Sequence, residues 1–317
     1  MYVVLNPVNI NPFFFDYLIK TKRMLNEFFK ISAGAVQRRR AIKKDDFLKI
    51  PIQFPPLSEQ EKIAEILSTV DELIQRTDEI IAKTERLKKG LMQELLTKGI
   101  GHKEFKETEI GRIPKDWEVV RLGEVLLLLR NGLTIEQNKE GIGYPITRIE
   151  TISEGRIDAS RVGYVANLTP EEIESYRLLE GDILFSHINS LQHIGKTAIY
   201  EGAPEFLLHG MNLLLLRPNK SKIYPQYLLY LLRLMRSRKI FWALSKKAVN
   251  QASINQTELG RTPIPLPPLS EQEKIAEILS TVDEKIEIER KRREKLERIK
   301  KSLMDLLLTG KIRVRVD

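Results

Sequence analysis

The stretch PPLSEQEKIAEILSTVDE at residues 55–72 decides the architecture of this chain, because it recurs without a single change at residues 267–284. A match of this length does not arise by chance, so the chain contains an internal repeat. Beyond the identical part the two copies diverge but stay in register as far as about Ile100 and Ile312. The repeat therefore gives the chain two related long segments with an intervening block between them.

A weaker similarity extends the repeat upstream of each copy. Ile50, Pro51 and Ile52 resemble Thr262, Pro263 and Ile264. After a slip of one residue the similarity continues, and it pairs Pro12, Tyr17 and Leu18 with Pro225, Tyr230 and Leu231. Residues 1–54 therefore resemble only the final part of the sequence that precedes the second copy.

Each copy of the repeat predicts a long amphipathic helix with a heptad seam. In the first copy Ser58 and Glu61 have the spacing of a capping box, and Gly99 marks the expected end. Apolar residues recur at alternating steps of three and four, with two threonines in the remaining slots; the predicted seam is Ile63, Ile66, Val70, Leu73, Thr77, Ile80, Thr84, Leu87 and Leu91. A helix this long needs a partner along its length, and scaffolding is the plain interpretation of the seam residues.

The second copy has the same expected cap, at Ser270 and Glu273, but its seam is interrupted by charge. The predicted positions are Ile275, Ile278 and Val282, then Lys285, Glu289 and Arg292, then Leu296, Ile299 and Leu303. We expect the two helices to pair with each other in antiparallel orientation, because the intervening block can then start and finish at neighbouring helix ends.

The intervening residues 107–266 have the pattern of an α/β module. Short apolar runs bounded by Gly, Asn or Pro predict strands at residues 118–121, 124–129, 144–149, 182–186, 197–200 and 211–217. One helix is expected after Pro170 and another at residues 225–244. The predicted fold is therefore an α/β (α+β) domain combined with two long helices that form an antiparallel coiled coil.

Composition narrows the class of protein. The 317 residues carry 52 Lys and Arg against 43 Asp and Glu, a formal net charge of +9, which favours a polyanionic partner such as nucleic acid. The sequence contains no Cys, which excludes disulfides and thiolate chemistry, and it has no apolar run long enough to cross a membrane. We expect a cytoplasmic protein with no membrane partner.

Motifs for catalysis are weak. The four histidines have no metal-ligand spacing, and Gly195-Lys196-Thr197 lacks the first glycine of a phosphate loop. Neither proline pair has the Asp/Asn-Pro-Pro-aromatic pattern of an amino-methyltransferase loop. We expect no catalytic residue, no metal site and no cofactor in this chain. A self-contained methyltransferase or nuclease, and an adaptor that binds no DNA, are the alternatives from other functional classes.

Polar loops follow several predicted strands, and their side chains carry the donors and acceptors that match base edges in the major groove. Basic residues that suit phosphate contacts lie near them in the sequence. The candidate DNA-binding residues are Arg130, Asn131, Thr134, Arg148, Ser186, His187, Asn189, Ser190, His209, Asn212, Lys246, Lys247, Asn250, Gln251 and Ser253. We expect substitution of Asn189 or Gln251 to change sequence preference, and Lys246→Ala to weaken binding to all sequences alike.

Across essentially its whole length the chain resembles the DNA-specificity subunit of type I restriction-modification systems. The matching segments are PIPLPPLSEQEKIAEILSTVDE at 263–284, LTGKIRV at 308–314, IPKDWEVVRLGEV at 113–125, GDILFS at 181–186, IGKTAIYEG at 194–202 and QASINQTEL at 251–259. The resemblance implies two target-recognition domains, each followed by a long helix, with each domain reading one half of a split site on double-stranded DNA.

The same resemblance implies the partners. Modification subunits, which bind S-adenosylmethionine and methylate adenine, would dock on the helix pair. A restriction subunit with ATP-driven translocation would cut unmodified DNA. S-adenosylmethionine, ATP and Mg are expected on these partners, and recognition alone is expected of this chain.

The chain departs from the family pattern at its start. The expected organisation is the final part of a first recognition domain at residues 1–54, a first long helix at 55–106, one complete recognition domain at 107–266, and a second long helix with the tail at 267–317. A gene fragment that is a non-functional remnant, a start codon placed too late, and a half-subunit that self-associates to restore two recognition domains are the explanations this leaves open.

Overall fold

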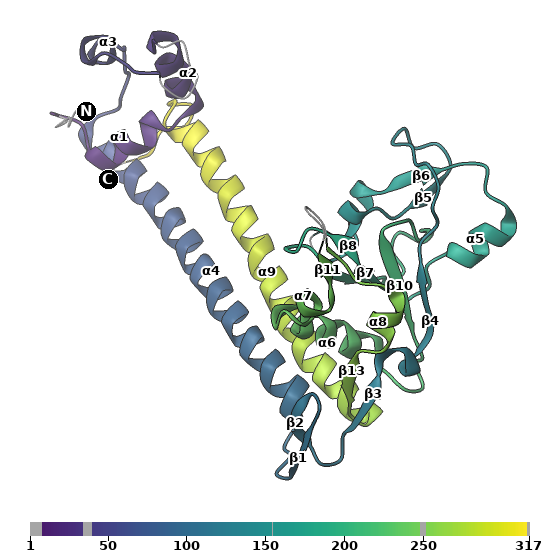
Figure 1. Ribbon diagram of the computed structural model, residues 1–317. Helices are drawn as coiled ribbons and strands as arrows, with labels where there is room; N and C mark the ends of the chain where they lie inside the picture. Colours follow the sequence, from purple (N-terminus) through teal and green to yellow (C-terminus); the bar gives the residue numbers. More distant parts are fainter. Residues whose placement is uncertain (1–7, 34–39, 154, 248–251, 316–317) are drawn as a thin grey trace. The chain divides into compact units, whose positions relative to one another are not determined.

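The computed structural model describes residues 8–33, 40–153, 155–247 and 252–315, and its contacts divide the chain into two units. Unit 1 combines residues 1–85 with residues 284–317, and unit 2 comprises residues 86–283. Two long helices, α4 (Leu57–Lys98) and α9 (Leu269–Leu307), continue from one unit into the other, as Figure 1 shows. Each unit is described below by itself.

The remaining elements are unequally shared between the units. Unit 1 adds three short helices, α1 (Pro12–Ile19), α2 (Lys22–Ile31) and α3 (Lys44–Leu48). Unit 2 holds every strand that the structure describes. Its elements in chain order are β1 (Phe105–Thr108), β2 (Gly111–Pro114), β3 (Glu118–Arg121), η2 (Leu122–Val125), β4 (Leu126–Asn131), β5 (Tyr144–Ile146), η3 (Ile149–Ile152), η4 (Ala159–Arg161), β6 (Gly163–Val165), α5 (Pro170–Tyr176), β7 (Ile183–Ser186), β8 (Ile188–Asn189), β9 (Thr197–Ile199), β10 (Leu213–Pro218), α6 (Pro225–Ser237), α7 (Ile240–Leu244), β11 (Lys246–Lys247), β12 (Ala252–Ser253), α8 (Gln256–Gly260) and β13 (Pro263–Leu266).

The two long helices pair in antiparallel orientation within each unit, as the sequence predicted. In unit 1, Lys300 and Arg293 of α9 contact Asp71 and Asp78 of α4, with N to O distances of 2.6 and 2.5 Å. The positions rise along one helix as they fall along the other, which is the signature of antiparallel packing. In unit 2 the α4 residue Lys88 lies 2.5 Å from Asp283 of α9.

The seam prediction was wrong at Leu73 and Leu87. The other predicted positions are buried (Ile63, Val70, Thr77 and Thr84) or partly buried (Ile66, Ile80 and Leu91). Leu73 and Leu87 are 37% and 56% exposed, whereas Leu67 is fully buried and Leu95 is 9% exposed. The sequence could not separate the alternatives, because Ile66 and Leu67, Leu73 and Ile74, and Ile80 and Ile81 are all adjacent apolar pairs.

The same shift applies to α9. The predicted seam positions Lys285 and Arg292 are exposed, and so are Ile278 and Ile299, at 38% and 40%. Ile286, one residue further along, is only 5% exposed. An apolar residue therefore occupies the part of the α9 seam where the sequence predicted a lysine.

Four local predictions also need correction. The long helices begin at Leu57 and Leu269, so Ser58 and Ser270 lie inside the first turn and are not the N-caps. The helix predicted at 225–244 is two helices, because Lys239 adopts a left-handed conformation, with φ of +61°, between α6 and α7. The strand predicted at 144–149 ends at Ile146, and the strand predicted at 124–129 begins at Leu126 after the short η2 turn.

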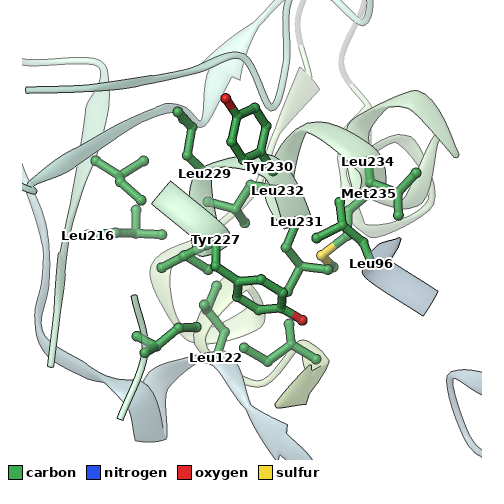
Figure 2. Packing of buried hydrophobic residues seen from close by; sticks show 14 of the residues in the cluster. Leu96, Leu122, Leu216, Tyr227, Leu229, Tyr230, Leu231, Leu232, Leu234 and Met235 are labelled. Carbon is green, nitrogen blue, oxygen red and sulfur yellow. The ribbon is translucent and has the colours of Figure 1, made fainter. Parts of the chain in front are cut away.

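Unit 2 is built on a four-stranded antiparallel sheet in the order β4-β10-β7-β9. Its core joins one face of this sheet to helix α6, whose Tyr227, Leu228 and Leu232 are completely buried. Figure 2 shows Tyr227 and Leu231 of α6 among Leu122 and Leu96, so the end of α4 shares this core. Burying so many large apolar side chains is the main stabilisation of the unit.

Unit 1 has a smaller core. Phe14, Tyr17 and Leu18 of α1 pack with Ile63 and Leu67 of α4, and the end of α9 contributes Leu307 and Leu308. Among the described residues this unit contains no strand of its own, only an isolated bridge between Ala33 and Ala41. Helices α1 and α2 therefore pack on the long helices, and α3 contacts α2 through the stacked rings of Phe47 and Phe28.

Candidate nucleic-acid interface

One edge of the four-stranded sheet gathers three of the predicted polar loops. Leu214 of β10 pairs with Asn131 at the end of β4, and Leu213 at the start of β10 pairs with Ser186 at the end of β7. Because these strands are antiparallel neighbours, the end of β4, the start of β10 and the end of β7 lie at the same edge. The loops at residues 130–134, 186–190 and 209–212 therefore converge in space.

The fourth loop joins this group through a small second sheet in the order β11-β12-β8. Asn189 pairs with Ala252, and Lys246 pairs with Ser253. The candidates Asn250 and Gln251 lie outside the described residues, and Lys247 is described only as part of strand β11. Asn189, Ser253 and Lys246 are thus held on adjacent strands that continue directly from the sheet edge.

Two glycines allow the backbones of the loops to pack closely against each other. A Cβ atom on Gly132 would lie 1.9 Å from the carbonyl oxygen of Gly210, so no other residue fits there without movement of the backbone. The neighbouring Leu133 N–H donates to the carbonyl of His209 at 2.9 Å. Gly210 N–H donates to the hydroxyl of Thr147, also at 2.9 Å. The loop that contains Arg148 is therefore tied to the same edge.

The two candidate arginines are held by partners within unit 2. The Arg130 guanidinium lies 3.9 Å from the centre of the Tyr176 ring and donates to the carbonyl of Ser175 at 3.1 Å. The Arg148 side chain lies 3.5 Å from Glu150 and donates to the Gln137 side chain at 3.5 Å. Stacking and ion pairing fix planar guanidinium groups in the geometry that bidentate contacts require.

Three candidates are buried, so they support the loops and do not reach a ligand from these positions. Ser186 is 1% exposed, His187 is 7% exposed and His209 is fully buried. The Nε2 atom of His209 donates to the carbonyl of Leu213 at 3.1 Å. Burial lowers the pKa of His187 to about 4, and burial with nearby positive charge lowers the pKa of His209 to about 3. Both imidazoles are therefore neutral at pH 7.

The remaining described candidates are accessible to different degrees. Asn131, Thr134 and Asn212 are exposed. Asn189 is half-buried: its Nδ2 donates to the Ser186 hydroxyl at 3.2 Å, and its Oδ1 accepts from the Ser190 N–H at 2.8 Å. The Lys246 side chain is 74% exposed, and its ammonium lies 3.7 Å from Glu258.

Gln137 was missed by sequence reasoning. Its side-chain oxygen accepts from Arg148, and its amide nitrogen lies 3.0 Å from the position that a Cβ atom on Gly210 would take. It links the Arg148 loop to the Gly210 turn. No pattern around residue 137 marks it, because the contact depends on loops that are distant in sequence.

Neither a metal nor a membrane is indicated by the part of the chain that the structure describes. Within the described ranges no three His, Asp or Glu side chains are grouped so that they could hold a metal ion. Among the described helices, none is long and apolar enough to span a bilayer. The chemistry available at the sheet edge is hydrogen bonding and positive charge.

A family comparison identifies the chain. The model of the type I restriction modification DNA specificity domain matches residues 2–86 and 114–298. The chain belongs to this family. Both units contribute to the match, and the second matched range includes the whole polar edge.

Curated relatives of this specificity-domain protein carry matching names. A Methanocaldococcus jannaschii protein, whose name assigns it to the MjaX type I restriction enzyme as a specificity subunit, is 62% identical over 205 residues. The type I restriction enzyme MjaVIII specificity subunit of the same organism is 36% identical over 288 residues. These matches cover 65% and 86% of this chain, and 48% and 65% of the relatives. The chain therefore spans about half to two thirds of their length.

Solved structures show the same fold. A chain from a structure titled for complex assembly and conformational transition of the type I R-M system matches with a TM-score of 0.60 at 21% identity, covering 94% of this chain and 71% of that one. The type I restriction-modification S subunit from M. genitalium also matches with a TM-score of 0.60, at 16% identity, covering 99% of this chain and 75% of that one. The family and the fold are thus established independently.

Proposed function

We propose that this chain reads DNA sequence as a specificity subunit of a type I restriction-modification complex, and that it directs adenine methylation and restriction by partner subunits. The observation that supports this most is the convergence of four polar loops at one edge of unit 2, in a chain of the specificity-domain family. The net charge of +9 suits a polyanionic ligand.

The chain contributes recognition, and the chemistry belongs to its partners. Modification subunits would supply S-adenosylmethionine and the methyl transfer, and a restriction subunit would supply ATP hydrolysis and Mg-dependent cleavage. This chain would need no cofactor of its own. We also propose that the chain acts in the cytoplasm, where its DNA substrate would be found.

Within the interface, exposed and half-buried residues have different proposed roles. Lys246 offers an exposed ammonium, which suits a phosphate oxygen, and a phosphate contact carries no sequence information. Asn189 presents an amide that neighbouring hydrogen bonds hold in one orientation, which suits a base edge. Ser186 and His209, being buried, position the loops on which such contacts depend.

This division of roles can be tested with binding isotherms on a selected target duplex and a scrambled duplex at several salt concentrations. Lys246→Ala should weaken binding to both duplexes alike and lower the salt slope by about 1. Asn189→Ala should reduce the ratio of the affinities for the target and the scrambled duplex by about 10-fold or more, because a lost base contact costs about 1–3 kcal/mol.

A matched control is Lys115→Ala. The Lys115 side chain is 66% exposed and pairs with Glu104 beside the separate β1-β2 hairpin, so its loss should leave both duplexes unaffected. Equal effects of the Asn189 and Lys246 substitutions on the two duplexes would contradict the division of roles. Affinity that does not change with salt would contradict DNA recognition itself.

A further inference from the structure

The segment between β7 and β9 leaves the four-stranded sheet and returns to it, and it carries the candidate residue Asn189. Two backbone hydrogen bonds close its ends: the Ser186 N–H donates to the carbonyl of Lys196, and the Gly195 N–H donates to the carbonyl of Ser186, both at 2.8 Å. We call residues 187–195 the β8 loop, because strand β8 lies within it. The conformation of this loop decides where the Asn189 amide lies.

Strand β12 holds only the first half of the β8 loop. Ala252 pairs with Asn189, and the N–H of Ile254 donates to the carbonyl of His187 at 2.9 Å. The second half, residues 190–195, belongs to no strand among the residues that the structure describes. Contacts from outside the sheets must therefore keep this second half in one conformation.

Arg236 of α6 supplies such contacts. Its Nη2 donates to the carbonyl of Gln192 at 2.6 Å, and its Nε donates to the carbonyl of Ile194 at 3.2 Å. Both donors belong to one planar guanidinium group, so the two carbonyls are fixed relative to each other and to the helix. The Ile194 N–H donates to the carbonyl of Ser190 at 3.0 Å, which ties the same turn to the residue after Asn189.

The helix that carries Arg236 is anchored in the core of unit 2. The preceding residues Leu234 and Met235 are 6% and 5% exposed and belong to that core (Figure 2). Helix α7 contributes a second contact, because a Cβ atom on Gly195, where φ is +74°, would lie 2.5 Å from the ring of Phe241. The turn of the β8 loop is therefore held by both helices.

The orientation of the Asn189 side chain depends on this turn. Its Oδ1 accepts from the Ser190 N–H at 2.8 Å, and its Nδ2 donates to the Ser186 hydroxyl at 3.2 Å. Ser190 is also the residue whose carbonyl closes the turn that Arg236 holds. A displacement of the turn would therefore move the amide that Asn189 offers to a base edge.

We propose that Arg236 is a positioning residue for base recognition: it holds the turn of the β8 loop so that Asn189 presents its amide to DNA in one orientation. This role rests on the proposed function and adds to it a residue that acts through the loop and does not touch DNA. A basic residue on a helix of a DNA-binding domain would ordinarily be assigned to a phosphate. The Nε and Nη2 donors of Arg236 are instead engaged by backbone carbonyls.

The experiment uses the full 317-residue chain and the variant Arg236→Lys. Lysine keeps the positive charge but carries one ammonium in place of the rigid fork, so it cannot reproduce both hydrogen bonds in their present geometry. Binding isotherms should show the ratio of the affinities for the target and the scrambled duplex reduced by about 10-fold, which is the order of effect of a lost base contact. The slope of log K against log salt should stay unchanged, because the phosphate contacts are the same.

Two further substitutions make the test specific. Arg238→Gln is the matched control, because Arg238 is exposed at the C-cap of α6 and its substitution removes a positive charge from the same helix. This control should keep the affinity ratio of the parent chain. Gly195→Ala disturbs the same turn from the side of Phe241, so it should lower the ratio as Arg236→Lys does. It provides a second reading in case Arg236→Lys does not fold.

Hydrogen exchange of the chain without DNA supplies an independent check. In Arg236→Lys the amides of Ile194 and Gly195 should exchange several-fold faster than in the parent chain, whereas the amides of β10 should be unchanged. A parent chain that binds both duplexes alike would contradict the proposed function and this role with it. A parent chain that discriminates, together with an Arg236→Lys variant that discriminates equally well, would overturn this role alone.

Discussion

Two pairs of repeated residues make the same contacts in unit 1 and in unit 2, although the described residues of unit 1 contain no sheet. The side-chain oxygen of Gln60 accepts from the N–H of Asn11, and its amide donates to the carbonyl of Pro55. Gln272 repeats both bonds, with the N–H of Tyr224 and the carbonyl of Pro267. The contacts that seat a short helix on the start of a long helix therefore do not depend on the sheet.

A second repeated contact links the long helices to the first short helix. Asp71 accepts from the Tyr17 hydroxyl at 2.6 Å and pairs with Lys300. Asp283 accepts from the Tyr230 hydroxyl at 2.9 Å and pairs with Lys88. Burial and the nearby carboxylates raise the pKa of both tyrosines, so both hydroxyls remain protonated donors.

The units differ where the sheet and its loops are present. All four histidines of the chain lie in unit 2, and two of them are buried at the sheet edge. Glu271 in unit 2 accepts from the side chains of His102 and Trp117, whereas the equivalent Glu59 binds Arg313 of the tail. The contacts of Gln60 and Asp71 with α1 therefore recur in unit 2 with α6, whereas the partners of Glu59 and Glu271 differ between the units.

We expect acid to produce the largest difference in stability between the two units. Above pH 6.5 both buried histidines are neutral whether the chain is folded or unfolded, so they cause no pH dependence. Below pH 6.5 the unfolded chain binds protons that the folded chain does not, because the folded pKa values of His187 and His209 are about 4 and about 3. Unit 2 should lose about 3 kcal/mol of stability per histidine as the pH falls to 4.

The measurement is urea unfolding at a series of pH values, monitored by tryptophan fluorescence, since Trp117 and Trp242 both belong to unit 2. His209→Gln should flatten the pH dependence, and His193→Gln, at an exposed site, serves as the control. An unchanged slope in the His209 variant would contradict the origin assigned to it.

Removing Glu271 should have the next largest effect. The carboxylate accepts from the Trp117 indole at 3.0 Å, from His102 at 2.9 Å and from the backbone N–H of Ile100 at 2.9 Å. Glu271→Ala leaves the donor of the fully buried Trp117 without this acceptor, so unit 2 should lose about 3 kcal/mol. The unfolding midpoint in urea measures the loss.

Glu59→Ala is the paired experiment in unit 1. The tail residue Arg313 lowers the pKa of Glu59 through a hydrogen bond, and the Arg313 side chain is 67% exposed. We expect a smaller loss of stability than for Glu271→Ala. The change should appear only as faster hydrogen exchange of the backbone near residues 312–314. Equal losses in the two units would show that the different partners do not matter.

The smallest effects are expected from the tyrosine contacts that the two units share. Tyr17→Phe and Tyr230→Phe each remove one hydroxyl from an aspartate that keeps its lysine partner, so each should cost about 1 kcal/mol. Hydrogen exchange measured separately in α1 and α6 reports on both units. A loss in one unit that is several times larger than in the other would contradict the equivalence of the two contacts.

Much of the architecture could be predicted from sequence because the repeat is explicit. The identical segment predicted two long helices, and their antiparallel pairing is confirmed by the ion pairs of Asp71 and Asp78 with α9. The exact seam could not be predicted, because α4 has apolar residues at both alternatives, such as Ile66 and Leu67. Packing against a partner chooses between them, and a single helix sequence does not contain that information.

The candidate site was predictable as a group of loops and not as individual residues. Strand ends marked by polar residues predicted these loops, and the structure brings them together at one sheet edge. The burial of Ser186 and His209 depends on strand pairing with β10, and the role of Gln137 depends on Gly210. Those contacts are long-range, so local patterns do not reveal them. Whether the exposed members touch DNA stays a prediction.

The most direct test of the central claim is methylation mapping. The chain, a modification subunit from the same genome, and the two together would each be incubated with unmethylated DNA and S-adenosylmethionine, and methylated adenines would then be located by sequencing. Our account predicts methylation at a defined motif only with both proteins, and a changed or lost motif with Asn189→Ala. Methylation at the same motif by the modification subunit alone, or none with both proteins, would contradict it.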